Sequence, residues 1–341
     1  EKLVGSLPWG LAMATVVTCT IFGAISGAGP AAIVAVGPLI YPALLKEGYN
    51  KKFSLGVITS SSTLAMLVPP GIAMILYGIT SGTSVSKLFM AGLIVGLLIM
   101  CLYLIYVYIY AKLHKLPKHP RASLKELLTA TADAGWALGL PVLILGGIYL
   151  GIMTPTEASA VAVAYTIIVE VLVYRSMTLK DIFQTAIASS RMVAMIFILI
   201  ASGSLLSWLM TVGQIPQNLV RLLSDMNPTA ILLLINLVFL VAGMFLDPNS
   251  AIIVLTPLIY PVGNSIGIDP IHLGMIIVLN ISIGMLTPPF GLNIFTATGT
   301  FKEPYDVVVP GVVPFIIIGL IGLLLVTFIP EISLWLPNLL G

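Results

Sequence analysis

Long apolar runs dominate the pattern of hydrophobic and polar positions along this chain. A transmembrane helix needs about 20 predominantly apolar residues, because the hydrocarbon core of a bilayer is about 30 Å thick. Seven runs are long enough to predict membrane spans: 53–78, 87–111, 135–152, 156–174, 191–212, 270–298 and 311–330. This pattern predicts an all-α polytopic membrane protein.

Two further apolar regions are each interrupted near the middle. Residues 3–45 are broken by the sequence SGAGP at 26–30, and residues 228–266 by LDPNS at 246–250. The apolar run after each break is too short for a comfortable span. We expect two re-entrant helical hairpins whose tips lie inside the membrane, where protein or a water-filled cavity must cover non-helical backbone.

An internal repeat relates these two regions. Residues 32–42 and 251–261 match at seven of eleven positions at an offset of 219, and the same offset pairs Pro69-Pro70 with Pro288-Pro289. Each copy is a hairpin followed by a helix that is broken at two prolines. Five predicted crossings lie between the copies, and this odd number makes them inverted. Inverted repeats with interrupted helices are typical of secondary transporters.

Composition and charge exclude several classes of protein. Apolar residues make up 59% of the 341 residues and charged residues 8%, against about 45–50% and 25% in ordinary globular proteins. Soluble enzymes, nucleic-acid-binding proteins and disordered proteins do not have such a composition. The net charge of +2 gives no reason to expect a nucleic-acid partner. Cys19 and Cys101 lie in apolar runs and are predicted to be packing residues.

The positive-inside rule orients the spans. It places 13 of the 15 lysines and arginines on the cytoplasmic side and leaves Lys87 and Arg221 outside. Residues 119–131 and 178–190 are expected to form amphipathic arms in the headgroup plane. An apolar stretch follows Glu1 almost at once, so we expect further residues before it.

The breaks supply candidate binding groups near the middle of the membrane. Unpaired carbonyls suit a hard cation, and the N–H groups of half-helix N-termini suit an anionic substrate. The small residues of the first tip allow close approach of the backbone. We predict substrate contacts at Gly29, Ser60, Ser61, Asn249 and Asn293; hydrogen bonding between helices is the alternative role of the two serines. Asp247 either binds an ion or tip amides, or only caps the helix that follows it, and both interpretations stay open. Glu157, by contrast, is predicted to belong to a capping box with Thr154.

Four segments carry a family resemblance: 22–30 (FGAISGAGP), 60–71 (SSSTLAMLVPPG), 154–158 (TPTEA) and 284–293 (GMLTPPFGLN). With them the chain resembles, over its whole length, the large membrane subunit of a tripartite ATP-independent periplasmic (TRAP) transporter. The resemblance implies an elevator-type, sodium-coupled importer of an organic acid, such as a sialic acid or a C4-dicarboxylate, in the bacterial inner membrane. It also implies a periplasmic substrate-binding protein and a small membrane subunit, separate or fused upstream, as partners. Sodium ions are the only cofactors expected.

The resemblance also implies two sodium sites. The first combines the tip residues Ser26 and Gly27 with carbonyls of Ala65, Val68 and Pro70. Adding the repeat offset gives Gly284, Thr287 and Pro289 for the second, with Asp247 in the second tip. In this scheme residues 1–80 and 227–301 form the two transport units, and residues 81–226 and 302–341 hold the scaffold helices and arms.

The residues leave two alternative functions open. A stand-alone sodium–dicarboxylate symporter would share the hairpin architecture. An intramembrane hydrolase would need Ser26 as an activated nucleophile. No histidine accompanies that serine, and alanine occupies position 24 of the Gly-x-Ser-Gly pattern.

Overall fold

The computed structural model describes residues 10–114 and 135–340, and every regular element in these two ranges is helical. Within these ranges, seven helical segments are long and apolar enough to cross a membrane, the interrupted stretch Lys51–Ser81 counting as one, which confirms an all-α polytopic membrane protein. The first half contains α1 (Gly10–Ser26), α2 (Gly29–Lys46), α3 (Lys51–Ser61), α4 (Leu64–Leu67), α5 (Ile72–Ser81) and α6 (Val85–Leu113). The middle contains α8 (Gly135–Tyr149), α9 (Pro155–Ile168), the π-helical turn η1 (Val169–Val173), α10 (Leu179–Val212) and α11 (Ile215–Leu223). The last part contains α12 (Pro228–Phe245), α13 (Pro248–Ser265), α14 (Pro270–Gly284), α15 (Leu292–Phe301), α16 (Tyr305–Phe328) and α17 (Glu331–Leu340).

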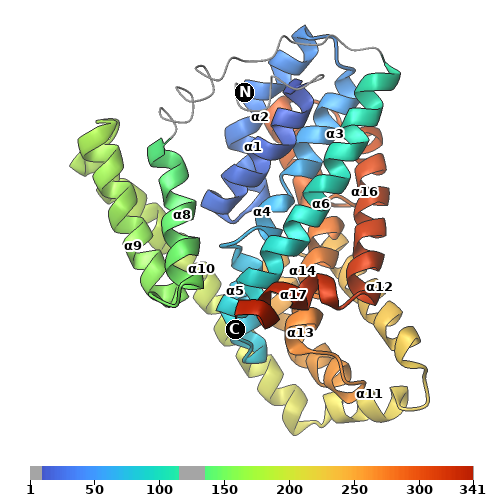
Figure 1. The fold of residues 1–341 in the computed structure, drawn as a ribbon. Coiled ribbons are helices and arrows are strands. Elements are labelled where there is room, and N and C mark those ends of the chain that lie inside the picture. The colour runs from blue at the N-terminus through green and yellow to red at the C-terminus, as the bar shows by residue number, and fades with distance from the viewer. Residues whose placement is uncertain (1–9, 115–134, 341) are drawn as a thin grey trace.

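The helix bounds follow the repeat offset. Shifting α2 (29–46) by 219 gives 248–265, which are the bounds of α13. Shifting α1 gives 229–245, against 228–245 for α12, and α14 begins 219 residues after α3. The correspondence continues into α6 and α16, whose first residues are 220 apart. In Figure 1, α1 and α2 occupy the upper half of the molecule and α13 the lower half.

The two broken helices form the buried centre of the molecule. Glycines let neighbouring helices approach them to backbone contact, because a glycine has no Cβ. A Cβ on Gly56 of α3 would lie 2.0 Å from the Gly311 carbonyl oxygen of α16. A Cβ on Gly92 of α6 would lie 2.7 Å from the Leu67 carbonyl oxygen, just before the first break. Helices α6 and α16 therefore pack directly on the broken helices.

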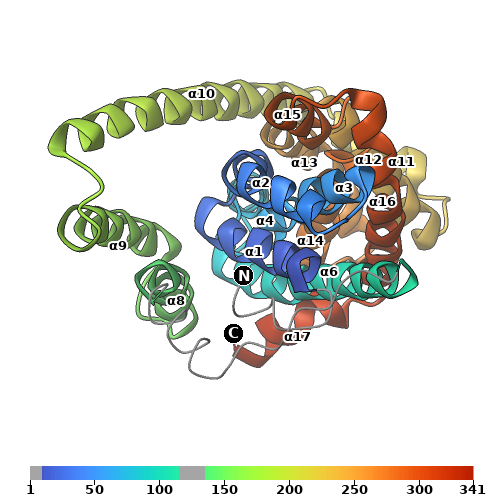
Figure 2. The same ribbon diagram turned by 90° about the horizontal axis from the view of Figure 1, so that it is seen from above.

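Helices α8 and α9 stand apart from this compact group, and α10 runs along its edge (Figure 2). Residues 178–190, predicted as an amphipathic arm in the headgroup plane, continue without a break into the 34-residue helix α10. Thr178 and Asp181 form a capping box at its start, and no glycine or proline follows before Gly203. At 1.5 Å per residue the helix is about 51 Å long. The other predicted arm, 119–131, lies outside the described residues.

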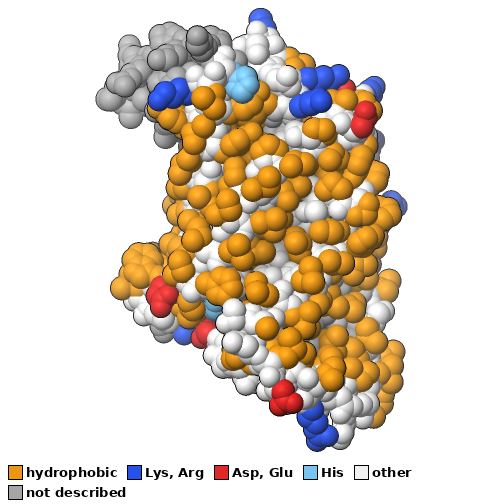
Figure 3. All heavy atoms as spheres, turned by 90° about the vertical axis from the view of Figure 1, so that its right-hand side faces the viewer, with side chains coloured by type: hydrophobic (Ala, Val, Ile, Leu, Met, Phe, Trp, Pro, Cys, Tyr) orange, Lys and Arg blue, Asp and Glu red, His pale blue; other side chains and the backbone are white. Residues whose placement is uncertain are grey.

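Several smaller predictions can be checked directly. Thr154 and Glu157 form the expected capping box, in which the Glu157 carboxylate accepts the Thr154 N–H at 2.8 Å. Cys19 is buried, Cys101 is exposed, and neither forms a disulfide. Helices α11 and α17 were not predicted. Figure 3 shows hydrophobic side chains over most of one face, with lysines and arginines gathered near its upper rim, as expected of a membrane protein.

Candidate functional site

The two hairpin tips meet at one cavity of about 130 Å³. Its lining combines both tips with residues next to both helix breaks: Gly27, Ala28, Gly29, Pro30, Met66, Ile72, Ala73, Asp247, Pro248, Asn249, Met285 and Leu292. The tips come from opposite halves of the molecule, since α1 and α2 lie in its upper part and α13 in its lower part in Figure 1. Segments more than 200 residues apart therefore build one site.

The two broken helices cross at equivalent residues. The Ser282 hydroxyl of α14 donates to the Thr63 carbonyl at 3.3 Å, and these residues are 219 apart. The contact therefore lies where the two copies of the repeat face each other, between the two breaks.

The first tip lies against the first break. Gly27 has φ +64°, and a Cβ there would lie 2.7 Å from the Pro70 carbonyl oxygen. Only glycine fits this position without cost, because a side chain would meet both a left-handed backbone and that oxygen. The predicted proximity of Gly27 and Pro70 is therefore present. Ser26 ends α1, and its hydroxyl donates to the Ala28 carbonyl at 3.5 Å.

Asn293 connects the second repeat to the first tip. Its side-chain amide donates to the Ser62 hydroxyl at 2.9 Å. A Cβ on Gly29 would lie 3.0 Å from Asn293 Nδ2, 3.2 Å from its Oδ1 and 3.3 Å from the Ser62 carbonyl oxygen. Asn293 is fully buried, and its Oδ1 has no hydrogen-bond partner among the described residues.

A group of buried hydroxyls lies at the end of α3 beside this contact. Among the described residues, the side-chain oxygens of Thr59, Ser60 and Ser61 have no hydrogen-bond partner. Buried polar atoms normally have one, and an unmet acceptor costs about 1–3 kcal/mol. Such buried oxygens need a partner from outside the described residues, such as a water molecule, an ion or a polar ligand.

The first break also frees backbone carbonyls. Proline has no N–H, so Pro69 and Pro70 cannot donate to the carbonyls four residues earlier, those of Ala65 and Met66. Ala65 packs against Gly23 of α1, where a Cβ would lie 2.4 Å from the Ala65 Cα. Val68 is buried beneath α6. The predicted first-site residues therefore lie around the first tip and the first break, but only Gly27 among them lines the cavity.

The second break has a different local structure. Gly291 has φ +56°, and a Cβ there would lie 3.0 and 3.1 Å from the carbonyl oxygens of Met285 and Thr287. The Thr287 hydroxyl donates back to the Ile283 carbonyl at 2.9 Å, which leaves its oxygen free to accept. The Pro289 carbonyl accepts the Tyr305 hydroxyl at 2.7 Å. Gly284 is also predicted for this site. A Cβ there would lie 2.6 Å from the Cα of Gly243 in α12, so this glycine lets α14 and α12 pack closely.

Asp247 caps α13, as one of the two open interpretations predicted. One carboxylate oxygen accepts the Asn249 N–H at 2.9 Å and the Ser250 N–H at 3.3 Å, and the other accepts the Ser250 hydroxyl. The side chain is exposed at the tip, and both Asp247 and Asn249 line the cavity. Its ion-binding role remains a prediction.

Some lining residues were missed by sequence reasoning. Met66, Met285, Ile72 and Leu292 line the cavity, but apolar side chains beside a break carry no chemical signal of their own. The repeat offset pairs Met66 with Met285, and could have identified both.

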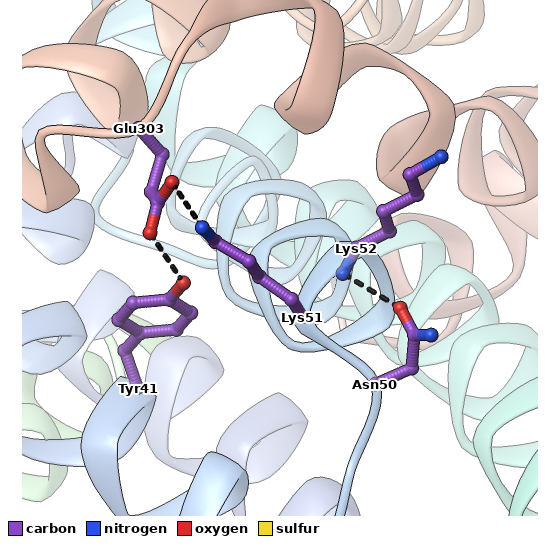
Figure 4. A network of polar contacts seen from close by, with 5 residues as sticks. All are labelled: Tyr41, Asn50, Lys51, Lys52 and Glu303. Atoms are coloured by element: carbon purple, nitrogen blue, oxygen red, sulfur yellow. Dashed lines mark hydrogen bonds and ion pairs between the residues drawn. The ribbon is translucent and has the colours of Figure 1, made fainter.

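A polar network ties the two repeats together at the far end of α2 (Figure 4). Glu303 accepts the Tyr41 hydroxyl at 2.9 Å and pairs with the Lys51 ammonium at 2.6 Å. The ring of Tyr41 also packs on Phe301, with centroids 4.9 Å apart. The hydrogen bond and charge of Lys51 hold the pKa of Glu303 below its usual range. The network thus fixes the first hairpin to the loop after α15.

The comparisons with known proteins agree with this architecture. Residues 1–332 match the family described as the DctM component of tripartite ATP-independent periplasmic transporters. The ectoine/5-hydroxyectoine TRAP transporter large permease protein of Ruegeria pomeroyi is 44% identical over 338 residues, which are 98% of this chain and 79% of that protein. The C4-dicarboxylate TRAP transporter large permease protein of Pseudomonas aeruginosa is 41% identical over 340 residues, 99% of this chain and 80% of that protein. The isethionate TRAP transporter permease protein of Oleidesulfovibrio alaskensis is 36% identical over 338 residues, 98% of this chain but 53% of that protein.

These relatives are transport proteins of the inner membrane, so membership of their family excludes the hydrolase alternative. A large permease of this family works with a substrate-binding protein and a small membrane subunit. The chain therefore belongs to the DctM family, the large permease component of TRAP transporters, and is an inner-membrane transport protein rather than an enzyme.

Proposed function

We propose that this permease uses a sodium gradient to import a small organic acid, which binds in the cavity between the two tips. The observation that carries the proposal is the cavity itself, because both tips and both broken helices contribute to its lining. A site at the interface of two repeats can open to one side of the membrane and then to the other when one body moves against its neighbour, as alternating access requires.

Two groups of oxygen atoms support sodium coupling. At the first tip, the Pro70 carbonyl lies beside Gly27, and the Ser62 carbonyl and Asn293 Oδ1 lie beside Gly29. At the second break, the carbonyls of Met285 and Thr287 lie beside Gly291. Unwound backbone carbonyls are the usual ligands of coupling ions in transporters of this kind. Among the described residues there is no cluster of carboxylates, cysteines and histidines that would bind a transition metal.

The substrate is proposed to present a carboxylate to the N-terminus of α2. Ala28 precedes that helix in extended conformation, and no side chain caps it. The first N–H groups of a helix have no acceptor within it and attract anions. The names of the relatives give different substrates, so similarity alone does not select the acid.

An elevator movement is proposed for the compact group of helices. The hairpins and broken helices would move together, with α8, α9 and α10 as part of the stationary frame. Helices α6 and α16 touch the broken helices at Gly92 and Gly56. We therefore propose that α6 and α16 move with the hairpins, although the sequence-based division assigned both helices to the stationary scaffold. A mainly apolar cavity of about 620 Å³ separates Pro70 and Phe89 of the compact group from α8, α9 and α10, which leaves room for sliding.

Reconstitution in proteoliposomes tests these proposals together. The permease with its small subunit, a matching binding protein and candidate acids should show uptake that stops when choline replaces sodium and that does not need ATP. Equal uptake in potassium or choline would disprove sodium coupling. Full-rate uptake of free substrate without a binding protein would favour a stand-alone symporter.

A further inference from the structure

A polar pocket of about 270 Å³ lies beside the second hairpin, between α13, the start of α14 and the loop from α5 into α6. The repeat offset of 219 carries all of its eight lining residues onto positions 41, 50–52, 301–303 and 306. The network of Figure 4 occupies those positions, and each residue drawn there has its counterpart in the lining: Tyr260, Asp269, Pro270, Ile271 and Ser84. The pocket is therefore the second repeat's equivalent of the network that fixes the first hairpin.

Three differences between the copies leave this space open. Phe301, whose ring packs on Tyr41, corresponds to Gly82. Glu303, which accepts the Tyr41 hydroxyl, corresponds to Ser84, and its ion-pair partner Lys51 corresponds to Pro270. An aromatic ring, a carboxylate and an ammonium thus fill the first network, and the corresponding positions of the second repeat carry none of these groups.

The groups that could receive a carboxylate are nevertheless present in the pocket. Tyr260 keeps the phenol of Tyr41, and among the residues that the structure describes its hydroxyl has no hydrogen-bond partner. Lys87 supplies an ammonium to the same lining. Within the described residues the ion pair of Lys51 with Glu303 is the single one, so Lys87 has no counter-ion there. Ser84 does not replace the missing carboxylate, because its hydroxyl accepts the Lys87 N–H at 3.5 Å as the cap of α6.

Asp269 also brings a negative charge to the pocket, but this carboxylate already has partners. Its Oδ1 accepts the N–H groups of Ile271 at 2.7 Å and His272 at 3.3 Å. A negative charge at a helix N-terminus is compensated in part by the helix dipole. The ammonium of Lys87 lacks such a partner, so the pocket is suited to one further carboxylate, and Asp269 supplies a test of the sign of the charge.

The pocket lies at the end of the molecule that the positive-inside rule places outside the cytoplasm. Helix α6 begins beside the pocket and ends next to Lys112 and His114, and its 29 residues span about 43 Å. Gly82, Ser84 and Asp269 are exposed, so the pocket can be reached from outside. A large permease of this family works with a periplasmic substrate-binding protein, which approaches from this side.

We propose that this pocket receives an acidic side chain of the substrate-binding protein. The incoming carboxylate accepts the Tyr260 hydroxyl and pairs with Lys87, as Glu303 does with Tyr41 and Lys51 at the first hairpin. Docking thereby completes, with a group from the binding protein, a contact that the first hairpin makes within the chain. The inference goes beyond the proposed function, because neither sodium coupling nor the identity of the substrate enters it.

Binding of the purified substrate-binding protein of this transporter to the complete membrane complex in nanodiscs tests the proposal. Sodium is held constant, and ionic strength is varied with choline chloride. Lys87→Gln should weaken binding by about tenfold or more and reduce its dependence on salt, because an opposite charge at the contact is removed. Asp269→Asn should tighten binding, since asparagine caps a helix as well as aspartate does and the repulsion of the incoming carboxylate disappears.

Arg221→Gln is the matched control for charge. Arg221 is the other basic residue predicted outside the cytoplasm, it is exposed on α11, and it does not line the pocket. Its loss changes the net charge by the same amount as Lys87→Gln. Binding should stay close to that of the wild type.

A second pair of variants leaves Lys87 in place and keeps the test valid if Lys87→Gln does not assemble. Ser84→Asp puts a carboxylate at the position equivalent to Glu303, and Ser84→Asn does not, while both residues cap a helix as serine does. Ser84→Asp should weaken binding as strongly as Lys87→Gln, and Ser84→Asn should bind like the wild type. In the Lys87→Glu background, changing the acidic residues of the binding protein to lysine one at a time should restore binding at one of them.

Four results would overturn the proposal. The first is equal binding by the wild type and Lys87→Gln, and the second is weaker binding by Asp269→Asn. The third is the same loss in Arg221→Gln as in Lys87→Gln, which would show a general effect of charge. The fourth is loss of the small membrane subunit from Lys87→Gln while Ser84→Asp binds normally, which would assign the pocket to that subunit. Uptake is not measured, so a failure of sodium coupling would leave these affinities unchanged.

Discussion

The two halves of the cavity share a backbone design but differ in their chemistry. Both hairpins have tips of two residues between helices whose bounds match at one offset. The first tip contributes glycines and backbone groups, with Gly27 held against Pro70. The second contributes Asp247, which caps its own helix. Duplication therefore explains the shape of the site, while the side chains that differ between the copies give its two ends different chemistry.

The two breaks differ as well. The first lies under α6, and Val68 and Pro69 are buried there. At the second, Pro289 and Phe290 are exposed and the Pro289 carbonyl is held by Tyr305. A buried break needs close helix packing at glycines such as Gly92 and Gly96, whereas an exposed one can change its contacts. The two breaks therefore differ in how they are packed, and mutations can separate their roles.

The largest effect is expected at the first tip. Gly27→Ala introduces a side chain at φ +64° and 2.7 Å from the Pro70 carbonyl oxygen, so the tip must move away from the break. Uptake should fall by more than about tenfold, because a left-handed alanine costs about 1–2 kcal/mol before any clash. Gly48→Ala is the control, since Gly48 has φ +83° with no heavy atom within 4 Å of its Cβ position. Similar uptake by the two variants would mean that contact with Pro70 is unimportant.

At the second break, Thr287→Val should weaken one sodium site. Losing an oxygen ligand should cost about 1–3 kcal/mol, or roughly 5- to 150-fold in sodium affinity. Apparent substrate affinity should fall with it by reciprocal linkage. Thr296→Val is the matched control. The Thr296 hydroxyl also donates to the carbonyl four residues earlier, at 2.9 Å, but it lies on an exposed face. Uptake against sodium concentration makes the comparison, and identical curves for Thr287→Val and wild type would remove Thr287 from the site.

Much of this arrangement follows from sequence, because the repeat is visible there. The breaks at two prolines, the small-residue tip and the capping box at Thr154 each follow from a local rule that few residues can satisfy. The offset then predicts which distant segments correspond. That information was enough to predict both hairpins, whereas the approach of Gly27 to Pro70 was expected only from the resemblance to the transporter family.

The rest depends on tertiary packing, which local patterns do not contain. The bond from Asn293 to Ser62 joins residues 231 apart in sequence, and the offset does not pair them. The continuation of 178–190 into α10 was not predicted, because amphipathic composition does not show whether a helix continues. The packing of α16 on α3 depends on Gly56 and Gly311, and a glycine within an apolar helix does not reveal its partner.

A smaller effect is expected at the contact between the repeats. Position 74 is the equivalent of 293, and it holds a buried methionine. Asn293→Met therefore makes the second repeat resemble the first and removes both the bond to Ser62 and the unpaired Oδ1. Sodium affinity should fall by roughly 5- to 30-fold, because about 1–2 kcal/mol is typical of a lost buried polar contact. A double-mutant cycle with Ser62→Ala measures the pair, and strictly additive losses would show that the two side chains act separately.

The smallest effect is expected at the network that joins the first hairpin to the loop after α15. Lys51→Gln removes the ammonium that pairs with Glu303 at 2.6 Å, whereas Lys52→Gln changes the neighbouring lysine, whose side chain makes no contact with Glu303 in Figure 4. Because half of the Lys51 side chain is exposed, the loss of stability should be about 1 kcal/mol or less.

The pH dependence of this stability gives the sharper comparison. The pKa of Glu303 is lowered by Lys51 and Tyr41 from its ordinary value of 4.5. A carboxyl group with a lowered pKa stabilises the folded state above that ordinary value, and the stabilisation disappears as the pH falls through the folded-state pKa. Thermal unfolding of the detergent-solubilised complex should therefore show a difference between wild type and Lys51→Gln at neutral pH that shrinks below pH 4.5, with Lys52→Gln following the wild type throughout. A difference that stays constant down to acid pH would mean that Lys51 stabilises the start of α3 by packing and not through the charge of Glu303.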